Sequence, residues 1–535
     1  MTPALLRIKK ALFLSLLIFC FASCKTIKQP QSVQQPLDYT DKDVIENEIN
    51  TIRAMEETES TKALFRAYLL GDKEIIEECK AVVLAQAEKA EQENDYSLAM
   101  RLYKSLGNTQ KFSSCEKQFY FDVPGFTVDQ KKLPKIPADC INATVTVWVD
   151  QGYKVENGAG YADIVIGSGF FIDKRGYIIT NYHVISEMVN PKRKTTCKLY
   201  IKLPSDIEKK IPAKIIGYDP IIDLALLKVE IEPEYVFELG SSSDLKLGDS
   251  VSAIGTPLGL EGTLTRGIIS STSRTLFTMG KVFQIDAAVN SGNSGGPLID
   301  ANNKVQAIVF AGLIQYQGLN FAIPVEYLKQ ELVYLYGRGE IIHPWIGCFG
   351  NTKREGLKKQ GLEVQYVLSG GSGFMSGLKP GDVITSFDGK QISSLDDFNF
   401  MMMSYETETI VECCYISADG EEKKCLVYLD KRPENPSVTV YNSDLITSSF
   451  VPLFGMKLIP SSTINRNSYT IEKIILGSTA DQMSFSENDS VTINGVQIDQ
   501  KNEVIITTLA TKRKKKAFLD VSMSLATSLD SPYYF

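Results

Sequence analysis

The chain has 535 residues, more than one hydrophobic core can accommodate, so roughly three or four folded units are expected. Its hydrophobic content of 44% and charged content of 23% are ordinary for globular protein and exclude a fibrous, wholly disordered or multi-span membrane protein. The net charge of −7 argues against a general nucleic-acid binder, because such proteins carry a basic face for the phosphates.

Residues 1–24 have the pattern of an export signal. Basic residues precede an apolar run from residue 11 to residue 21, which is shorter than the ~20 residues that a membrane-spanning helix needs. Two small residues and then Cys24 follow, an order that resembles the processing site of a bacterial lipoprotein. We therefore expect a protein of the bacterial cell envelope, facing the periplasm or the cell surface, with a membrane tether through lipidated Cys24. The alternative is a plain secretory signal with an incidental cysteine.

Residues 25–41 are rich in Gln, Pro and Lys and are predicted to form a flexible tether. Residues 42–125 are predicted to form a small helical domain, because alanine and aromatic residues recur there at helix-face intervals. One stretch, 90–106, resembles part of a tetratricopeptide unit, but a repeat array needs several stacked copies. A plain helical domain is therefore favoured over a partner-docking array.

From residue 143 the pattern changes to short apolar runs separated by glycine, which is typical of β-strands. These runs predict a β-barrel-type domain over residues 135–340. They lie at 144–149, 164–172, 177–180, 224–229 and 305–310.

The candidate nucleophile is Ser294. Peptide-bond hydrolysis by nucleophilic attack needs an activated hydroxyl, a base, a group that orients the base, and donors for the oxyanion. Ser294 lies in the sequence Gly-Asn-Ser-Gly-Gly-Pro at residues 292–297. The flanking glycines allow a tight turn that brings amide N–H groups beside a substrate carbonyl.

The candidate base is His183. The chain has only two histidines, and the other, His343, stands beside a proline at a domain junction. His183 follows the apolar run 177–180, which suits a base held at a sheet edge. Asp223 precedes a buried strand, where an unpaired carboxylate would be costly, so it is expected to accept a hydrogen bond from the His183 ring. The order of histidine, aspartate and serine is that of chymotrypsin.

These residues lie within segments that together resemble the HtrA (DegP-like) serine proteases. The resemblance covers residues 135–435 and implies two chymotrypsin-type β-barrels with the triad of His183, Asp223 and Ser294 in the cleft between them. It further implies ATP-independent cleavage of misfolded proteins and assembly as a homotrimer or a larger homo-oligomer. The segments are 167–170, 180–184, 219–228, 292–297 and 320–324.

The resemblance also implies an oxyanion hole made by the backbone N–H groups of Gly292, Asn293 and Ser294, in which one donor is typically worth ~3 kcal/mol of transition-state stabilisation. Proteases that cut after Lys or Arg carry an aspartate six residues before the serine, and Ala288 stands there in this chain. With Val289 beside it, the specificity pocket is expected to be neutral and apolar and to favour small or medium aliphatic side chains.

Residues 344–433 look like an HtrA PDZ domain, through the sequence Trp-Ile-Gly-Cys at 345–348 and a Gly-Leu-Lys-Pro-Gly-Asp-Val-Ile stretch further on. In such a domain a hydrophobic-Gly-hydrophobic loop presents backbone N–H groups to a peptide's terminal carboxylate, while the peptide adds as a β-strand. Ile346, Gly347 and Cys348 occupy the matching positions.

Residues 445–530 repeat this order more weakly, with Asn488 in place of an expected glycine, and are predicted to form a degenerate PDZ-like domain. The predicted fold class is therefore multidomain and mainly β. A small helical domain precedes a chymotrypsin-like double β-barrel, and two PDZ-like domains follow.

The resulting hypothesis is a lipid-anchored serine endopeptidase of the HtrA type. It would bind C-terminal peptides through PDZ modules and cleave unfolded or misfolded exported proteins through an acyl-enzyme, without a metal or organic cofactor. The alternative is a lipoprotein chaperone or PDZ scaffold with little or no proteolysis. A pseudoenzyme is disfavoured because the motifs are retained.

Overall fold

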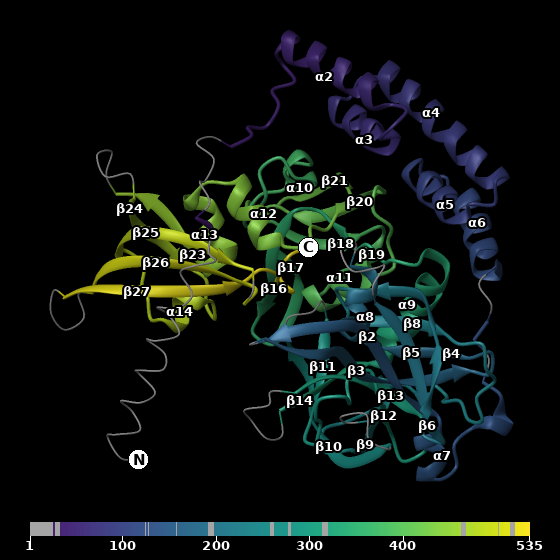
Figure 1. Cartoon of the computed structure of the whole chain (residues 1–535). Coiled ribbons are helices and arrows are strands. Elements are labelled where there is room, and N and C mark those ends of the chain that lie inside the picture. Colours follow the sequence, from purple (N-terminus) through teal and green to yellow (C-terminus); the bar gives the residue numbers. More distant parts are fainter. Residues whose placement is uncertain are drawn as a thin grey trace. The chain divides into compact units, whose positions relative to one another are not determined.

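The computed structural model describes residues 25–26 and 33–535, apart from 123–124, 127, 157, 191–196, 257–261, 277–279, 313–318, 462–466, 501 and 514–518. The chain divides into two compact units. Figure 1 labels helices and strands along the whole chain. The barrel unit comprises Glu78–Pro344 and Asp396–Thr409. The C-terminal unit comprises Met1–Glu77, Trp345–Leu395 and Ile410–Phe535.

The N-terminal region is helical, as predicted. α3 ends where Gly71 adopts φ +77°, the left-handed conformation common after a helix. Asp95 caps α5, since its side chain accepts a hydrogen bond from the Leu98 amide at 3.1 Å. The helices are α2 (Lys42–Met55), α3 (Ser60–Leu70), α4 (Lys73–Gln92), α5 (Tyr96–Ser105) and α6 (Thr109–Asp122).

A seven-stranded antiparallel sheet begins the β-rich part of the barrel unit, in the order β6-β5-β2-β3-β4-β8-β7. β4 and β8 pair with Thr180 opposite Ala225, so the residues that follow β4 and those that precede β8 lie at the same edge. The short helix α7 (Pro137–Asn142) precedes β2 in the chain, and α8 (Tyr182–Val189) lies between β4 and β5. The strands are β2 (Thr144–Glu156), β3 (Ala159–Asp173), β4 (Tyr177–Thr180), β5 (Lys198–Leu203), β6 (Asp206–Pro212), β7 (Lys214–Asp219) and β8 (Leu224–Lys228).

A closed six-stranded barrel follows, in the order β10-β11-β14-β13-β12-β9. Small and β-branched side chains such as Val251, Ala253 and Val309 fill its interior. The helix α9 (Val325–Arg338) comes after the last strand. The strands are β9 (Ser250–Gly255), β10 (Thr263–Thr275), β11 (Lys281–Ile285), β12 (Pro297–Ile299), β13 (Val305–Gly312) and β14 (Asn320–Pro324).

The first sheet of the C-terminal unit has the order β16-β17-β18-β20-β21, with β19 paired to β18. In the chain, α10 (Ser372–Met375) follows β17, and α11 (Leu395–Met402) separates β19 from β20. The strands are β16 (Cys348–Glu355), β17 (Lys358–Val367), β18 (Val383–Phe387), β19 (Lys390–Gln391), β20 (Ile410–Ile416) and β21 (Glu422–Tyr428).

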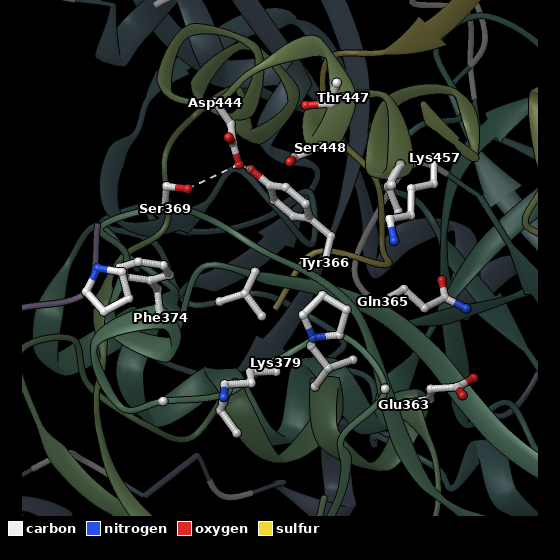
Figure 2. A pocket seen from close by; sticks show the side chains of 18 of the residues that line it. Glu363, Gln365, Tyr366, Ser369, Phe374, Lys379, Asp444, Thr447, Ser448 and Lys457 are labelled. Carbon is white, nitrogen blue, oxygen red and sulfur yellow. Dashed lines mark hydrogen bonds between the residues drawn. The ribbon is translucent and has the colours of Figure 1, made fainter. Parts of the chain in front are cut away.

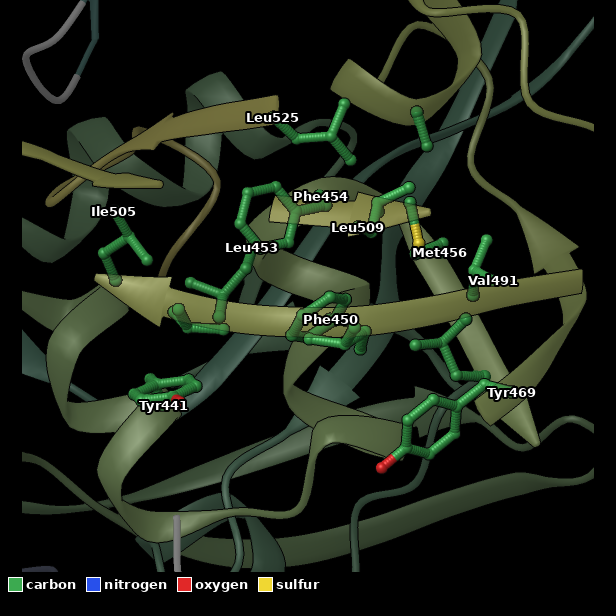
Figure 3. Close-up of a cluster of buried hydrophobic side chains, with 14 of the residues drawn as sticks. Tyr441, Phe450, Leu453, Phe454, Met456, Tyr469, Val491, Ile505, Leu509 and Leu525 are labelled. Carbon is green, nitrogen blue, oxygen red and sulfur yellow. The ribbon is translucent and has the colours of Figure 1, made fainter. Parts of the chain in front are cut away.

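The second sheet of this unit runs in the order β23-β24-β25-β26-β27 over a separate apolar core. Figure 3 shows Phe450 and Phe454 of α13 packed against Leu509 and other strand residues. Residues 500–503 connect β25 to β26, which is too short for a helix such as α11. The elements are α12 (Pro436–Ser443), α13 (Ile446–Phe454), β23 (Met456–Pro460), β24 (Ser468–Ile474), α14 (Thr479–Gln482), β25 (Ser490–Asp499), β26 (Val504–Arg513) and β27 (Leu519–Ser528).

These sheets confirm the prediction of a mainly β chain with a helical N-terminal region. Of the helices that the structure describes, none combines the length and the apolar character needed to cross a bilayer. Cys24, the predicted lipidation site, lies outside the described residues.

Candidate active site

His183 and Asp223 lie side by side at one edge of the seven-stranded sheet. His183 is in the first turn of α8, which follows β4, and Asp223 directly precedes β8. The ring Nδ1 of His183 lies 2.7 Å from Asp223 Oδ2, and the His183 amide donates to Asp223 Oδ1 at 2.8 Å. One carboxylate thus orients both the ring and the backbone of the histidine, which leaves ring Nε2 for a reacting group.

The backbone of Asp223 adopts φ +62°, a left-handed conformation that non-glycine residues rarely take. Asn181 holds it there, because the Asn181 side-chain amide donates to the Asp223 carbonyl at 2.8 Å. Asn181 is fully buried, and it stands between β4 and His183 in the chain. Local strain of this kind persists only where neighbouring contacts fix it, and here it turns the carboxylate toward the imidazole.

Two opposing effects act on the pKa of His183. Burial of the ring favours the neutral form, but the hydrogen bond and the negative charge of Asp223 outweigh burial and raise the pKa of His183 above its ordinary value. The His183 side chain is still 47% exposed, while that of Asp223 is only 13% exposed. The ring is therefore open to an incoming group, and the carboxylate behind it is shielded.

Ser294 lies in a glycine turn that packs against β3 and β4. Gly295 has φ +86°, and a Cβ atom there would lie 2.2 Å from the Ser168 carbonyl oxygen and 2.4 Å from Thr180 Oγ1. The Ser168 amide also donates to the Ser294 carbonyl at 2.7 Å. Only glycine permits this approach, so the turn is held against the strands that lead to the histidine.

The Ser294 carbonyl lies beside Gly167, where a Cβ atom would also clash with Val184, the residue after His183. The serine and the histidine are therefore brought to the same edge of the sheet. The Ser294 hydroxyl, however, donates to the Phe310 carbonyl at 3.2 Å, and no hydrogen bond joins it to His183 within the described part of the chain. In this arrangement the predicted nucleophile and the predicted base lie at the same edge of the sheet without a hydrogen bond between them.

The three predicted oxyanion donors differ in their partners. The Asn293 amide donates to the Asn290 carbonyl at 3.0 Å and is occupied in this arrangement. The amides of Gly292 and Ser294 donate to no group among the residues that the structure describes. Gly292 has φ +101°, a conformation that favours glycine, so the turn depends on its lack of a side chain.

The two predicted pocket residues have different surroundings. Ala288 is exposed, and its carbonyl accepts a hydrogen bond from Thr265 Oγ1 at 2.8 Å. Val289 is partly buried and packs against the core of the closed barrel. The chain leading into the turn therefore offers a small side chain on its exposed side and no carboxylate at either position.

Sequence reasoning missed the part played by Asp219 and His343. His343 Nε2 lies 2.7 Å from Asp219 Oδ2, and both side chains are completely buried. The other oxygen, Asp219 Oδ1, accepts the amides of Ile221 and Ile222 at 2.8 and 3.0 Å. This carboxylate therefore shapes the loop that leads to Asp223. The sequence did offer one indication of this contact, because His343, the second of the two histidines, had been given no partner.

The segment before His343 is hydrogen-bonded to β7, the strand that ends at Asp219. The Tyr218 amide donates to the Gly339 carbonyl at 2.9 Å, and the Ile341 amide donates to the Tyr218 carbonyl at 3.0 Å. The Tyr218 ring stacks on the ring of Tyr182, the residue before His183, with ring centroids 5.5 Å apart. Residues 339–343 thus act as an additional edge beside β7.

The predicted carboxylate-binding loop lies at the start of β16. Ile346 and Cys348 are fully buried, and Gly347 adopts φ +77°. The Gly347 carbonyl accepts the Leu368 amide at 2.7 Å, and the Cys348 amide donates to Phe535 at 2.8 Å. The loop is therefore held by backbone hydrogen bonds, and the Cys348 amide already has a partner, the Phe535 oxygen.

The C-terminal unit contains a cavity of about 1210 Å³ that is lined by residues of both its sheets. Figure 2 shows several of the side chains that line it. On its wall the Tyr366 hydroxyl donates to Asp444 Oδ2 at 3.0 Å, and Ser369 Oγ lies 3.3 Å from the same oxygen. Burial raises the pKa of Asp444, although these hydrogen bonds oppose the change. None of the predicted site residues lines this cavity.

Three family models match the chain. One described as a trypsin-like peptidase domain matches residues 167–308, one described as a TP0546 family PDZ domain matches residues 437–529, and one described as a domain of unknown function (DUF8517) matches residues 43–119. The fold and these matches define a trypsin-like peptidase domain combined with a C-terminal PDZ domain.

Curated relatives share the name probable periplasmic serine endoprotease DegP-like. The protein of Bartonella henselae is 34% identical over 60% of this chain and 63% of its own length. That of a Marinomonas species is 31% identical over 62% of this chain and 71% of its own length. A solved chain, the HtrA-type protease AlgW with a tripeptide, has a TM-score of 0.47 and 26% identity, covering 55% of this chain and 95% of that chain.

The chain therefore belongs to the DegP-like serine endoprotease family. It spans less than two thirds of the Bartonella relative and 49% of the Hahella chejuensis relative.

Proposed function

We propose that the chain is a serine endopeptidase in which Ser294 is the nucleophile, His183 the general base and Asp223 the group that orients the base. The observation that carries this proposal is the 2.7 Å contact between His183 Nδ1 and Asp223 Oδ2 beside the glycine turn of Ser294. Family membership supports the same assignment.

The chemistry follows from these three side chains. Ser294 Oγ attacks the peptide carbonyl carbon while His183 Nε2 takes the hydroxyl proton, and the imidazolium is stabilised by Asp223. The amides of Gly292 and Ser294 would stabilise the oxyanion. The protonated histidine then gives its proton to the leaving amine, which leaves an acyl-enzyme. A water molecule, deprotonated by the same histidine, hydrolyses this ester and restores the serine.

One rearrangement must precede attack. The Ser294 hydroxyl has to exchange the Phe310 carbonyl, 3.2 Å away, for the ring nitrogen of His183. If the Asn293 amide is to serve as a third oxyanion donor, it must leave the Asn290 carbonyl as well. The proposed active form therefore differs locally from this arrangement at the turn 290–294.

The proposed substrates are unfolded or misfolded exported polypeptides. A neutral pocket near Ala288 and Val289 would favour small or medium aliphatic side chains before the scissile bond. The loop of Ile346, Gly347 and Cys348 is proposed to bind C-terminal peptides. The names of the relatives support a location in the bacterial cell envelope. Anchoring through lipidated Cys24 and assembly as a homotrimer or larger homo-oligomer are further parts of this proposal.

A scaffold or chaperone without proteolysis is the second candidate, favoured by one observation, the bond from Ser294 Oγ to Phe310 instead of His183. A fluorophosphonate probe and casein degradation separate the two. The wild type should form one covalent adduct at Ser294 and degrade casein, while Ser294→Ala should do neither. Ser205→Ala, at an exposed serine, is the matched control and should behave like the wild type. Casein degradation by Ser294→Ala at the wild-type rate would refute the proposed mechanism.

A further inference from the structure

Residues 533–535 form an extra strand on β16, directly beside the loop 346–348. The Cys348 amide donates to the Phe535 oxygen at 2.8 Å, and the Phe535 amide donates to the Cys348 carbonyl at 2.9 Å. The Gly350 amide then donates to the Tyr533 carbonyl at 3.1 Å, and Phe349 lies opposite Tyr534 in an antiparallel bridge. This alternation is the hydrogen-bond pattern of a peptide that extends a sheet edge.

The pairing leaves no free edge on β16 at this point. Its other side is already paired with β17, from Cys348 opposite Val367 to Glu355 opposite Lys358. An outside peptide that bound beside the loop 346–348 would need the amide and carbonyl of Cys348 and the amide of Gly350. All three groups are bonded to residues 533–535.

The side chains of this strand are buried as deeply as core residues. Phe535 is 3% exposed and Tyr534 is 1% exposed. A Cβ atom on Gly350 would lie 2.0 Å from the Glu363 carbonyl oxygen and 3.2 Å from a carbon of the Phe535 ring, so the strand pairing excludes a side chain there and the ring packs over the bare backbone. The Tyr534 ring packs edge-on against Phe349, with centroids 5.2 Å apart. Its hydroxyl lies 3.1 Å from Ser437 Oγ of α12.

The chain that leads into this strand is also fixed. The Ser437 amide donates to the Leu529 carbonyl at 3.0 Å, and the Arg432 guanidinium donates to Asp530 Oδ1 at 2.6 Å. Only 3% of the Arg432 side chain is exposed. The second sheet therefore presents residues 533–535 to the first in a defined position.

We propose that residues 533–535 are an intramolecular ligand of the loop 346–348, and that an outside peptide binds this site only after displacing them. This rests on the proposed function in one respect, the assignment of peptide binding to the loop. The ligand class it defines is an extended peptide with aromatic side chains in the segment that pairs with β16. The main-chain pairing of residues 533–535 supplies the competition, whatever sequence an outside peptide has.

The competition is strong because the occupant is tethered. A ligand on a short connection has an effective concentration of about 1 mM. If residues 533–535 have an intrinsic Kd of about 10 μM for the loop, an outside peptide would bind about 100-fold more weakly than to an empty site, whatever its own Kd.

The test uses the full chain with Ser294→Ala, to prevent cleavage of the probe. The probe is a fluorescein-labelled peptide of the sequence Ser-Pro-Tyr-Tyr-Phe. Its binding is measured by fluorescence polarisation. The chain should bind it weakly, and the additional pair Tyr534→Ala and Phe535→Ala should tighten binding by at least tenfold. Equally tight binding by both proteins would contradict the proposal that residues 533–535 occupy the loop 346–348. It would leave the assignment of peptide binding to this loop unchanged. Absence of binding by both, with the variant folded by circular dichroism, would overturn peptide binding at this loop.

A second variant avoids the loss of buried aromatic rings. Phe349 and Tyr534 are directly opposite in a pair without mutual hydrogen bonds, where Cα atoms lie about 4.5 Å apart, within the range of a disulfide. In Phe349→Cys with Tyr534→Cys, oxidation should abolish probe binding and reductant should restore it. The parent chain taken through the same oxidation and reduction is the control. Undiminished binding by the oxidised double-cysteine variant would contradict the proposal.

Discussion

His343 Nε2 lies 2.7 Å from Asp219 Oδ2, and neither side chain is exposed. The histidine belongs to the segment that leaves the barrel unit, and the aspartate is the last residue of β7, directly before the loop that leads to Asp223. This contact therefore joins the exit of the domain to the acid of the proposed triad.

Replacing His343 by alanine should leave a buried carboxylate without its side-chain donor, which typically costs about 3–5 kcal/mol. We expect a lower melting temperature and a lower kcat for a chromogenic peptide, because Asp219 would no longer hold the loop before Asp223. His343→Gln keeps a donor and should recover part of both losses. If kcat of the alanine variant is unchanged while its melting temperature falls, the contact is structural only.

The Asp223→Asn variant should reduce kcat by about 10⁴, because the amide stabilises the wrong tautomer of His183. The raised pKa of His183 depends on the hydrogen bond and charge of Asp223. In the wild type, activity should fall as pH falls through this raised pKa, since the base must be neutral. In the variant the acid limb of the kcat/KM profile should move to lower pH. An unshifted limb would show that another group controls it.

The raised pKa of His183 also predicts how the stability of the protein depends on pH. A histidine whose folded-state pKa is raised stabilises the protein below its unfolded pKa of about 6.5, and this contribution is lost as pH rises through the folded pKa. The difference in melting temperature between wild type and His183→Ala should therefore be larger at pH 5 than at pH 9. A constant difference would contradict the pairing.

Glu331 of α9 is fully buried, and both its carboxylate oxygens lack a partner among the described residues. Burial and the nearby charge of Asp219 raise the pKa of Glu331. Because an acid with a raised pKa costs stability once the unfolded chain can ionise, Glu331→Gln should gain stability relative to wild type as pH rises above about 4.5. Thermal melts at pH 4 and pH 8 would measure this, and an equal change at both values would refute it.

Gly295 and Gly420 share φ +86° but differ in their surroundings. A Cβ atom on Gly295 would lie 2.2 Å from the Ser168 carbonyl, whereas nothing lies within 4 Å of one on Gly420. Gly295→Ala should therefore displace the turn of Ser294 and reduce kcat/KM by at least about 100-fold, the scale of losing an oxyanion donor. Gly420→Ala should cost only backbone strain of about 1 kcal/mol and leave activity unchanged. Equal activities of the two variants would contradict the role given to the turn.

The sequence predicted the edge where His183 and Asp223 meet, because apolar runs mark β4 and β8 and polar residues mark their ends. It could not predict the rotamer of Ser294, since the choice between the Phe310 carbonyl and the His183 ring depends on distances between loops. His343 was set aside because it stands beside a proline at a domain junction, and its partner Asp219, 124 residues away in the chain, cannot be assigned from the sequence. Residues 533–535 carry no signal of their own, since strand pairing with β16 depends on tertiary structure.

Residues 500–503 leave no space for a helix between β25 and β26. A PDZ domain adds its peptide as a strand at a sheet edge, and the second sheet of the C-terminal unit has no described helix at the position that α11 holds between β19 and β20. We therefore expect one bound peptide per chain, although the C-terminal unit contains two sheets of related architecture. A calorimetric titration that saturates at two equivalents would require a site of another kind.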